Sequence, residues 1–207
     1  MSSAVLASTQ IWWFTARAGG LVAWALAALS ILWGLALSTR ALGRKPRAPW
    51  LLDLHRFLGG LTVVFVFVHM TGLWADQYVH FSVTQLLVPF AATWKPLAVA
   101  WGVVAFYLLL AVELTSLLRS RVPARVWRVV HLSSFVLFAL ATIHLLGAGT
   151  DRRTGLLRLV VMAVTIGIVA VTMLRLVMAD EREQRASSQG LDATPAPSQP
   201  ASRQTLT

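Results

Sequence analysis

The chain has 207 residues, of which 57% are hydrophobic and only 13% are charged, and its mean hydropathy is +0.69. Stretches of about 20 apolar residues, long enough to cross the hydrocarbon of a membrane, recur along it, which excludes an ordinary water-soluble domain. The formal net charge of +10 does not indicate nucleic-acid binding, because many of the basic residues are confined to two short loops between these stretches.

Five apolar segments are long enough to span a membrane. They lie at Ile11–Ser38, Trp50–Trp74, Pro96–Leu118, Val122–Gly147 and Thr154–Met178. The first is too long and too rich in tryptophan for a cleaved signal peptide, and no charged region precedes it. We therefore predict an all-α integral membrane protein in which five transmembrane helices form one bundle surrounded by lipid.

The C-terminal part of the chain has a different composition. From Asp180 onward it is rich in Ser, Gln, Pro, Ala and charged residues. Such a segment cannot bury enough apolar surface to offset the entropy lost on ordering. We predict one membrane domain, residues 1–178, followed by a disordered cytoplasmic tail, residues 179–207.

The basic residues predict the orientation of the bundle. The first and third loops hold Arg40, Arg44, Lys45, Arg47, Arg119, Arg121, Arg125 and Arg128. Short loops rich in Lys and Arg stay in the cytoplasm. Arg152 and Arg153 in the fourth loop oppose this trend, but the eight basic residues outweigh them. We expect a multi-pass protein of the cell membrane with its N-terminus outside and its C-terminus in the cytoplasm.

Four of the five histidines lie in pairs inside two of the apolar segments. His55 and His69 belong to the second segment, and His131 and His144 to the fourth. Ionisable residues in hydrocarbon are costly and mark functional sites. One helix separates the two segments, so they run in the same direction, and spacings of 14 and 13 residues correspond to about 21 and 20 Å along each axis. The pairs therefore match in depth, with His55 and His131 near the cytoplasmic ends and the other two nearer the outside.

The angular positions are less regular. Fourteen residues fall about 40° short of four helical turns, so the first two histidines share a face, whereas thirteen fall about 140° short. The fourth helix therefore needs a bulge or local distortion, or its histidines approach their partners from different sides. Ser133, Ser134 and Thr142 could bend it through hydrogen bonds to the backbone.

Two couples of histidines at two depths favour a planar metal cofactor with an axial imidazole on each face. We predict two non-covalent, bis-histidine b-type haems. The chain has no cysteine, which excludes disulfides, iron–sulfur clusters, thiolate-ligated haem and covalent c-type attachment. Zinc or copper would gather three or four ligands together. The alternative is a histidine-based metal or proton transporter without haem, which predicts midplane carboxylates and broken helices that the sequence does not clearly offer.

Five further residues are candidates for secondary roles. Gly59 and Gly60 lie between the two histidines of the second segment and admit either a porphyrin face or close helix packing. Arg17 could pair with a propionate of the outer haem or extend to the membrane interface. His80, in the second loop, could be a proton donor, a contact for a substrate metal or without a role. Glu113 could take part in proton or quinone chemistry or hydrogen-bond within the bundle.

The histidine spacings, together with the segment Leu54-His55-Arg56-Phe57-Leu58-Gly59-Gly60, resemble the ferric reductase-like transmembrane domain. That family includes the haem domains of NADPH oxidases, ferric reductases and the bacterial methionine sulfoxide reductase system. The resemblance covers about Ile11 to Met178. It implies that His55 and His131 ligate a cytoplasmic-side haem and that His69 and His144 ligate an outer haem. The sequence departs from the usual pattern of the family in two ways: it has five predicted helices instead of six, and it has no fused flavin–nicotinamide module.

The function expected from these features is electron transfer across the membrane. Electrons from a flavoprotein reductase or a quinol would enter on the cytoplasmic side. They would leave to an extracytoplasmic acceptor, which could be ferric iron, oxygen or a partner oxidoreductase. No dinucleotide fingerprint or P-loop is present in this sequence, so we expect the flavin or quinol donor to come from elsewhere.

Overall fold

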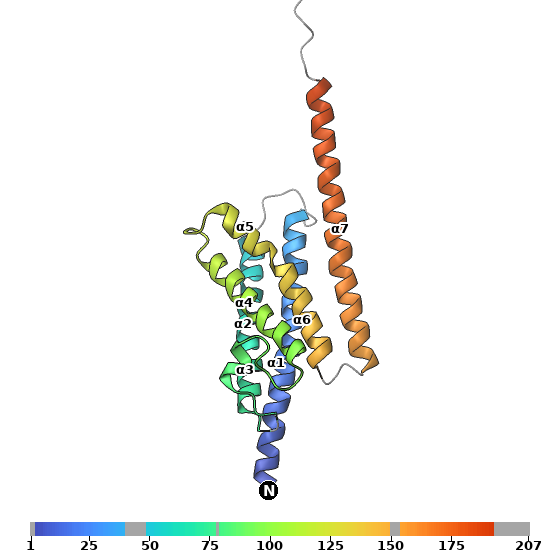
Figure 1. Ribbon diagram of the computed structural model, residues 1–207. Helices are drawn as coiled ribbons and strands as arrows, with labels where there is room; N and C mark the ends of the chain where they lie inside the picture. Colours follow the sequence, from blue (N-terminus) through green and yellow to red (C-terminus); the bar gives the residue numbers. More distant parts are fainter. Residues whose placement is uncertain (1–2, 40–48, 78, 150–153, 193–207) are drawn as a thin grey trace, which may run out of the picture.

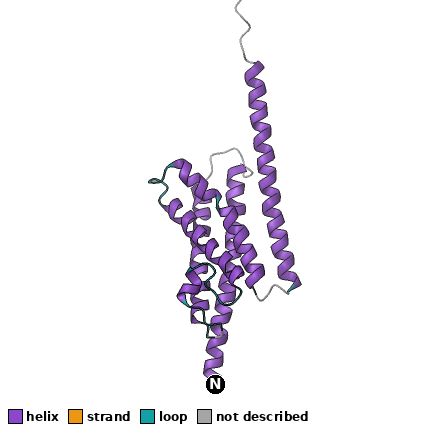
Figure 2. Ribbon diagram, in the orientation of Figure 1, coloured by secondary structure: helices purple, strands orange, loops and turns teal. Residues whose placement is uncertain are grey.

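A computed structural model describes residues 3–39, 49–77, 79–149 and 154–192, and each regular element in these ranges is a helix (Figure 2). In chain order they are α1 (Ser3–Thr39), α2 (Pro49–Ala75), α3 (Val83–Leu87), α4 (Pro96–Leu117), α5 (Ala124–Leu132), α6 (Ser134–Ala148) and α7 (Gly155–Asp192) (Figure 1). The five predicted spans are confirmed as helices of sufficient length and apolarity, with α5 and α6 together forming the fourth. The all-α membrane fold is therefore confirmed.

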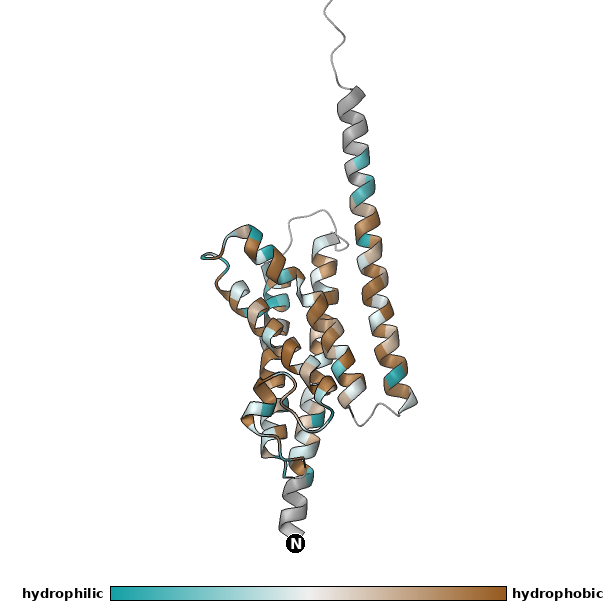
Figure 3. Ribbon diagram, viewed as in Figure 1, coloured by the Kyte–Doolittle hydropathy of each residue, from teal (hydrophilic) through white to brown (hydrophobic). Residues whose placement is uncertain are grey.

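The long helices alternate in direction. Figure 1 shows α1, α4 and α7 running one way, while α2 and the α5–α6 pair run the other way. Helix α1 packs against α2, α6 and α7, and α4 packs against α2, α5 and α6. Brown, apolar residues dominate the membrane-spanning lengths in Figure 3. The parallel course of α2 and α5–α6 is what the depth matching of the histidines requires.

The fourth span is broken at Ser133, where α5 ends and α6 begins. The backbone N–H of Ser133 donates to the carbonyl groups of Val129 and Val130, at 3.2 and 3.1 Å. Its hydroxyl donates to the Val130 carbonyl at 2.6 Å. Contacts of this kind tighten the backbone and bend helices. Of the two alternatives expected for this span, the structure shows the local distortion.

The largest buried cluster joins α1 to α6 and α7. It consists of Trp24, Ala27, Ala28, Ile31, Leu35, Phe138, Val161 and Ile168. Trp24 stacks on Phe138, and its indole N–H donates to the hydroxyl of Thr142 at 2.9 Å. This bond satisfies the polar atom of a buried tryptophan. The buried alanines on α1 let the neighbouring helices approach it closely.

The connection between α2 and α4 is tied down over one end of the bundle. Its short helix α3 starts with a capping box in which Ser82 and Gln85 bond to each other's backbone N–H groups. The Nζ of Lys95 donates to the Gly147 carbonyl at 3.0 Å, which holds the end of the connection against α6. The hydroxyl of Tyr107 donates to the Leu87 carbonyl at 2.8 Å. These bonds keep the connection above the space between the helices.

Helix α7 is the longest element, and it continues past the expected domain boundary at residue 178 to Asp192. The residues after Asp180 include Glu, Arg, Gln and Ala, which have high helix propensity. The helix therefore extends into the segment predicted as a tail. Residues 193–207 of that tail lie outside the described residues, as do the basic residues at positions 40–47 and 152–153.

Candidate functional site

The four histidines of the membrane spans meet as two couples. The ring centroids of His55 and His131 are 6.0 Å apart, and those of His69 and His144 are 6.2 Å apart. The two planes are nearly perpendicular in each couple, at 73° and 80°. These are the couples predicted from depth matching, one near each end of the α2 and α5–α6 pair.

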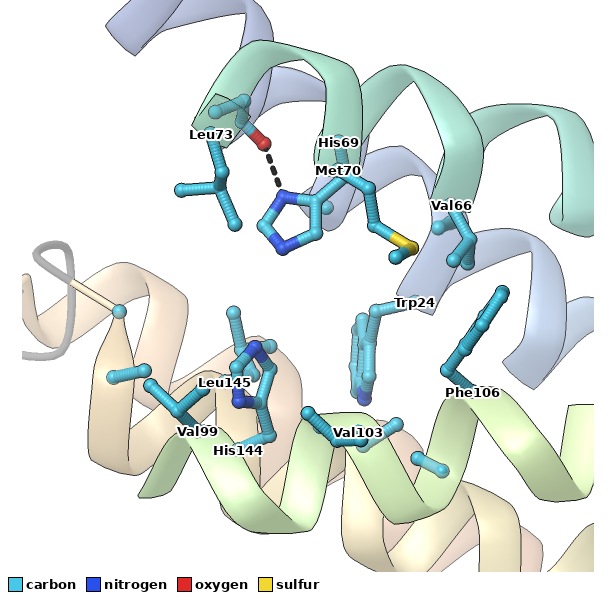
Figure 4. Close-up of a pocket in the computed structure, with 18 of the residues that line it drawn as sticks. Trp24, Val66, His69, Met70, Leu73, Val99, Val103, Phe106, His144 and Leu145 are labelled. Carbon is cyan, nitrogen blue, oxygen red and sulfur yellow. Dashed lines mark hydrogen bonds between the residues drawn. The ribbon is translucent and has the colours of Figure 1, made fainter. Parts of the chain in front are cut away.

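The separation within each couple suits two axial ligands of one metal ion. Imidazoles that bind from opposite sides, each through a nitrogen about 2 Å from the metal, have ring centres about 6 Å apart. Figure 4 shows His69 and His144 turned towards each other from α2 and α6. Within the described part of the chain, no group of three or more His, Cys, Asp or Glu side chains gathers as a metal site. The donor set is therefore two separate couples.

Backbone carbonyl groups orient both histidines of the couple near α3. The Nδ1 atom of His69 lies 2.6 Å from the carbonyl oxygen of Ala16, and that of His144 lies 2.8 Å from the carbonyl oxygen of Ala98. A carbonyl group only accepts, so each Nδ1 must donate a proton. The Nε2 atom then keeps its lone pair, which is the arrangement found in metal-bound histidines.

The imidazoles of the other couple, His55 and His131, make fewer and longer hydrogen bonds. The Nδ1 atom of His55 lies 3.3 Å from the hydroxyl of Ser30. The Nδ1 atom of His131 is buried without a hydrogen-bond partner among the described residues. Trp127 stacks on the His131 ring with centroids 4.9 Å apart, and the Arg119 guanidinium lies 4.6 Å from the Trp127 ring. This couple is thus held by stacking on one side and by a single hydroxyl on the other.

Three glycines on neighbouring helices lie directly against three of the histidines. An added Cβ would lie 2.9 Å from Nδ1 of His69 at Gly20, 3.1 Å from Cε1 of His55 at Gly34, and 2.6 Å from Nδ1 of His144 at Gly102. A methyl group at such distances forces a shift. Gly20 and Gly34 are 14 residues apart on α1, which is the spacing of the two histidines on α2. That shared spacing is the signal that could have revealed them in the sequence.

Gly59 and Gly60 have different surroundings from these glycines. A Cβ at Gly60 would meet nothing within 4 Å. A Cβ at Gly59 would overlap the carboxyl group of Glu113 on α4. Gly59 therefore lies against Glu113 in the structure. The expected role of both glycines beside a porphyrin stays a prediction.

A cavity of about 210 Å³ opens beside the His69–His144 couple. Its lining is almost entirely apolar and includes Trp24, Val103 and Phe106, which Figure 4 labels. Arg17 also lines the cavity, as its predicted role beside a propionate requires. His80 is exposed and does not line it, although the adjacent Val79 and Phe81 do. The site is therefore an apolar chamber with one couple of imidazoles and one guanidinium.

The fold and this geometry define a multi-pass helical membrane protein with two histidine couples at two depths. The family model described as "Ferric reductase like transmembrane component" matches residues 19–142, more than half of the chain, and the protein belongs to this family. The predicted family is therefore confirmed. The match includes His55, His69 and His131, while His144 lies two residues beyond it. No curated protein and no solved structure matches the chain significantly. Membership of this family indicates a role in haem binding and transmembrane electron transfer.

Proposed function

We propose that this protein is a di-haem b-type cytochrome subunit that moves electrons across the cell membrane. Residues 1–178 would form the haem-binding domain, and residues 179–207 a cytoplasmic tail. The observation that supports this function best is the separation of about 6 Å between imidazole centroids at both depths. A single structural histidine needs no partner at that distance, and two couples with the same separation point to two equivalent ligand sets.

Each part of the site would have a defined task. His55 and His131 would hold one haem, and His69 and His144 the other. The carbonyl groups of Ala16 and Ala98 direct the unprotonated nitrogens of the second couple, and apolar side chains would surround the haem. Arg17 would neutralise a propionate. Bound haem supplies reversible one-electron chemistry of iron, while the protein supplies position and surroundings.

The direction of transfer follows from the charges at the two ends. The exposed Arg119, Arg121, Arg125 and Arg128 lie at the α4–α5 end, which supports a cytoplasmic location for that end. A flavoprotein or quinol would therefore deliver electrons to the His55–His131 level. The His69–His144 level, about 20 Å away along the helices, would pass them to ferric iron, oxygen or a partner oxidoreductase outside.

An optical spectrum of the purified protein tests the proposal. We expect a low-spin b-type spectrum that changes on reduction with dithionite, with two haems per chain by chemical haem assay. The absorbance of the reduced haem and the protein concentration give this ratio directly. A colourless preparation from cells supplied with ample haem would overturn the proposed function.

Single cysteines test the orientation, because the native chain has none. Thr84→Cys places a thiol on the exposed surface of α3, and Ser120→Cys places one in the exposed α4–α5 turn. In intact cells a membrane-impermeant maleimide should label Thr84→Cys, whereas Ser120→Cys should react only after permeabilisation. The opposite pattern would reverse the orientation and with it the direction of electron flow.

A further inference from the structure

Glu113 is an acid inside the α4 membrane span, and none of the proposed haem-binding residues explains it. Its side chain is half-buried. The carboxyl group lies so close to Gly59 of α2 that an added Cβ would overlap Oε1. A glycine at this point of α2 therefore leaves room for the acid. An acid kept in hydrocarbon against a neighbouring helix is expensive and marks a functional position.

The carboxyl group lies close to one of the histidine couples. Gly59 follows His55 by four residues on α2, which is about 6 Å of helical rise. Glu113 therefore contacts α2 about one turn deeper in the membrane than the His55–His131 couple. At such a distance inside a protein, charges interact far more strongly than in water. A change of charge at this couple would be felt at the carboxyl group.

Polar groups continue from Glu113 towards the exposed end of α4. Ser116 follows three residues later, so it lies on the same side of α4, and the exposed Arg119 comes next in the turn after the helix. The hydroxyl of Ser116 is buried and has no hydrogen-bond partner among the described residues. A hydroxyl both accepts and donates. The Ser116 hydroxyl thus lies between Glu113 and the exposed α4–α5 turn in the sequence and is free to bond to either side.

Eight charged or titratable residues lie on the helices that pack against α4. They are Asp53, His55, Arg56 and His69 on α2, Arg125, Arg128 and His131 on α5, and His144 on α6, with none on α3. Asp53 is the acid in this set, and it is exposed and pairs with Arg56 at 3.3 Å. Among the described residues, no ion pair joins Glu113 to any of these groups.

We propose that Glu113 is a redox-linked proton site, an inference that rests on the proposed function. His55 and His131 would hold the haem, whose iron would accept one electron from a quinol, a reduced flavin or dithionite. The carboxylate of Glu113 would then take up one proton from water at the α4–α5 turn through Ser116 and become a carboxylic acid, so the charge of the region would be unchanged. Compensation of this kind avoids adding an uncompensated negative charge inside hydrocarbon.

Redox titration at several pH values tests this inference. The potential of the component that His55→Ala removes should fall as pH rises, approaching about 59 mV for each tenfold change in proton concentration at full coupling. Glu113→Gln should flatten this dependence. Asp53→Asn is the matched control, because it removes an exposed acid two residues from His55 and should leave the slope unchanged. Ser116→Ala should slow proton uptake after rapid reduction and leave the equilibrium slope intact.

Infrared difference spectra of the wild-type protein give an independent readout. The reduced-minus-oxidised spectrum should contain a carbonyl band of a newly protonated carboxylic acid, and Glu113→Gln should lose it. If Glu113→Gln does not fold, Glu113→Asp keeps a carboxyl group at this position and should shift the frequency of the band. The inference would be overturned if the potential did not depend on pH and no carbonyl band appeared, or if both persisted in Glu113→Gln. The proposed function would still stand if the protein held two b-type haems. A wild-type protein without haem would overturn both.

Discussion

Replacing His69 or His144 by alanine should remove the same one of two b-type redox components, and replacing His55 or His131 should remove the other. Each substitution takes one of the two axial imidazoles from one couple, and the other couple lies about 20 Å away along the helices. The haem content should fall from two to one per chain. Redox titration followed optically would identify the missing component.

His80→Ala is the control for this series, because His80 is exposed and does not line the cavity. Both components should survive that substitution with unchanged potentials. Loss of different components in His55→Ala and His131→Ala would show that the couples are not ligand pairs. Loss of both haems in every variant would instead indicate that the bundle does not assemble with a single cofactor.

Adding one methyl group behind a histidine should weaken haem binding at that couple without abolishing it. Gly20→Ala and Gly102→Ala place a Cβ at 2.9 Å from His69 and 2.6 Å from His144. Both contacts are with Nδ1, the atom held by a backbone carbonyl group. Displacing a ligand's supporting contacts typically lowers metal affinity by about 10- to 100-fold. We expect a selective weakening of the outer haem, measured by haem titration of the apoprotein.

The glycines offer their own controls. Gly167→Ala on α7 meets nothing within 4 Å and does not line the cavity, so haem affinity at both levels should be unchanged. Gly34→Ala places its Cβ at 3.1 Å from His55 and should affect only the inner component, more mildly than the outer substitutions. Normal affinity at the outer level in Gly102→Ala would contradict the idea that close helix approach positions the imidazole.

Much of the fold follows from simple counting along the sequence. The spans were predictable because hydrocarbon thickness sets helix length and because loops with Lys and Arg break the apolar segments. The couples were predictable because depth in a helix is proportional to residue number, so spacings of 14 and 13 match. A distortion such as the break at Ser133 was one of two alternatives expected from the sequence, since thirteen residues on an ideal helix would turn His131 away from the face of His144.

Other features depend on contacts between helices that the sequence does not encode locally. The acceptors of the Nδ1 protons are carbonyl groups of Ala16 and Ala98, and every residue has such a group. Which glycine faces which histidine depends on the rotation of α1 against α2. For that reason the sequence indicates Gly59 and Gly60, which lie between His55 and His69, and not Gly20 and Gly34. Helix α7 extends beyond residue 178 because local propensity continues after the apolar stretch ends.

The break at Ser133 places the two histidines of the fourth span on two separate helices. One residue inserted into a continuous helix rotates everything beyond it by about 100°, so both ligands of such a helix must be altered together. Here the nine-residue α5 holds His131 and the fifteen-residue α6 holds His144. The two ligands of the fourth span therefore lie on separate helices, and a change of backbone angles at Ser133 would turn one imidazole relative to the other.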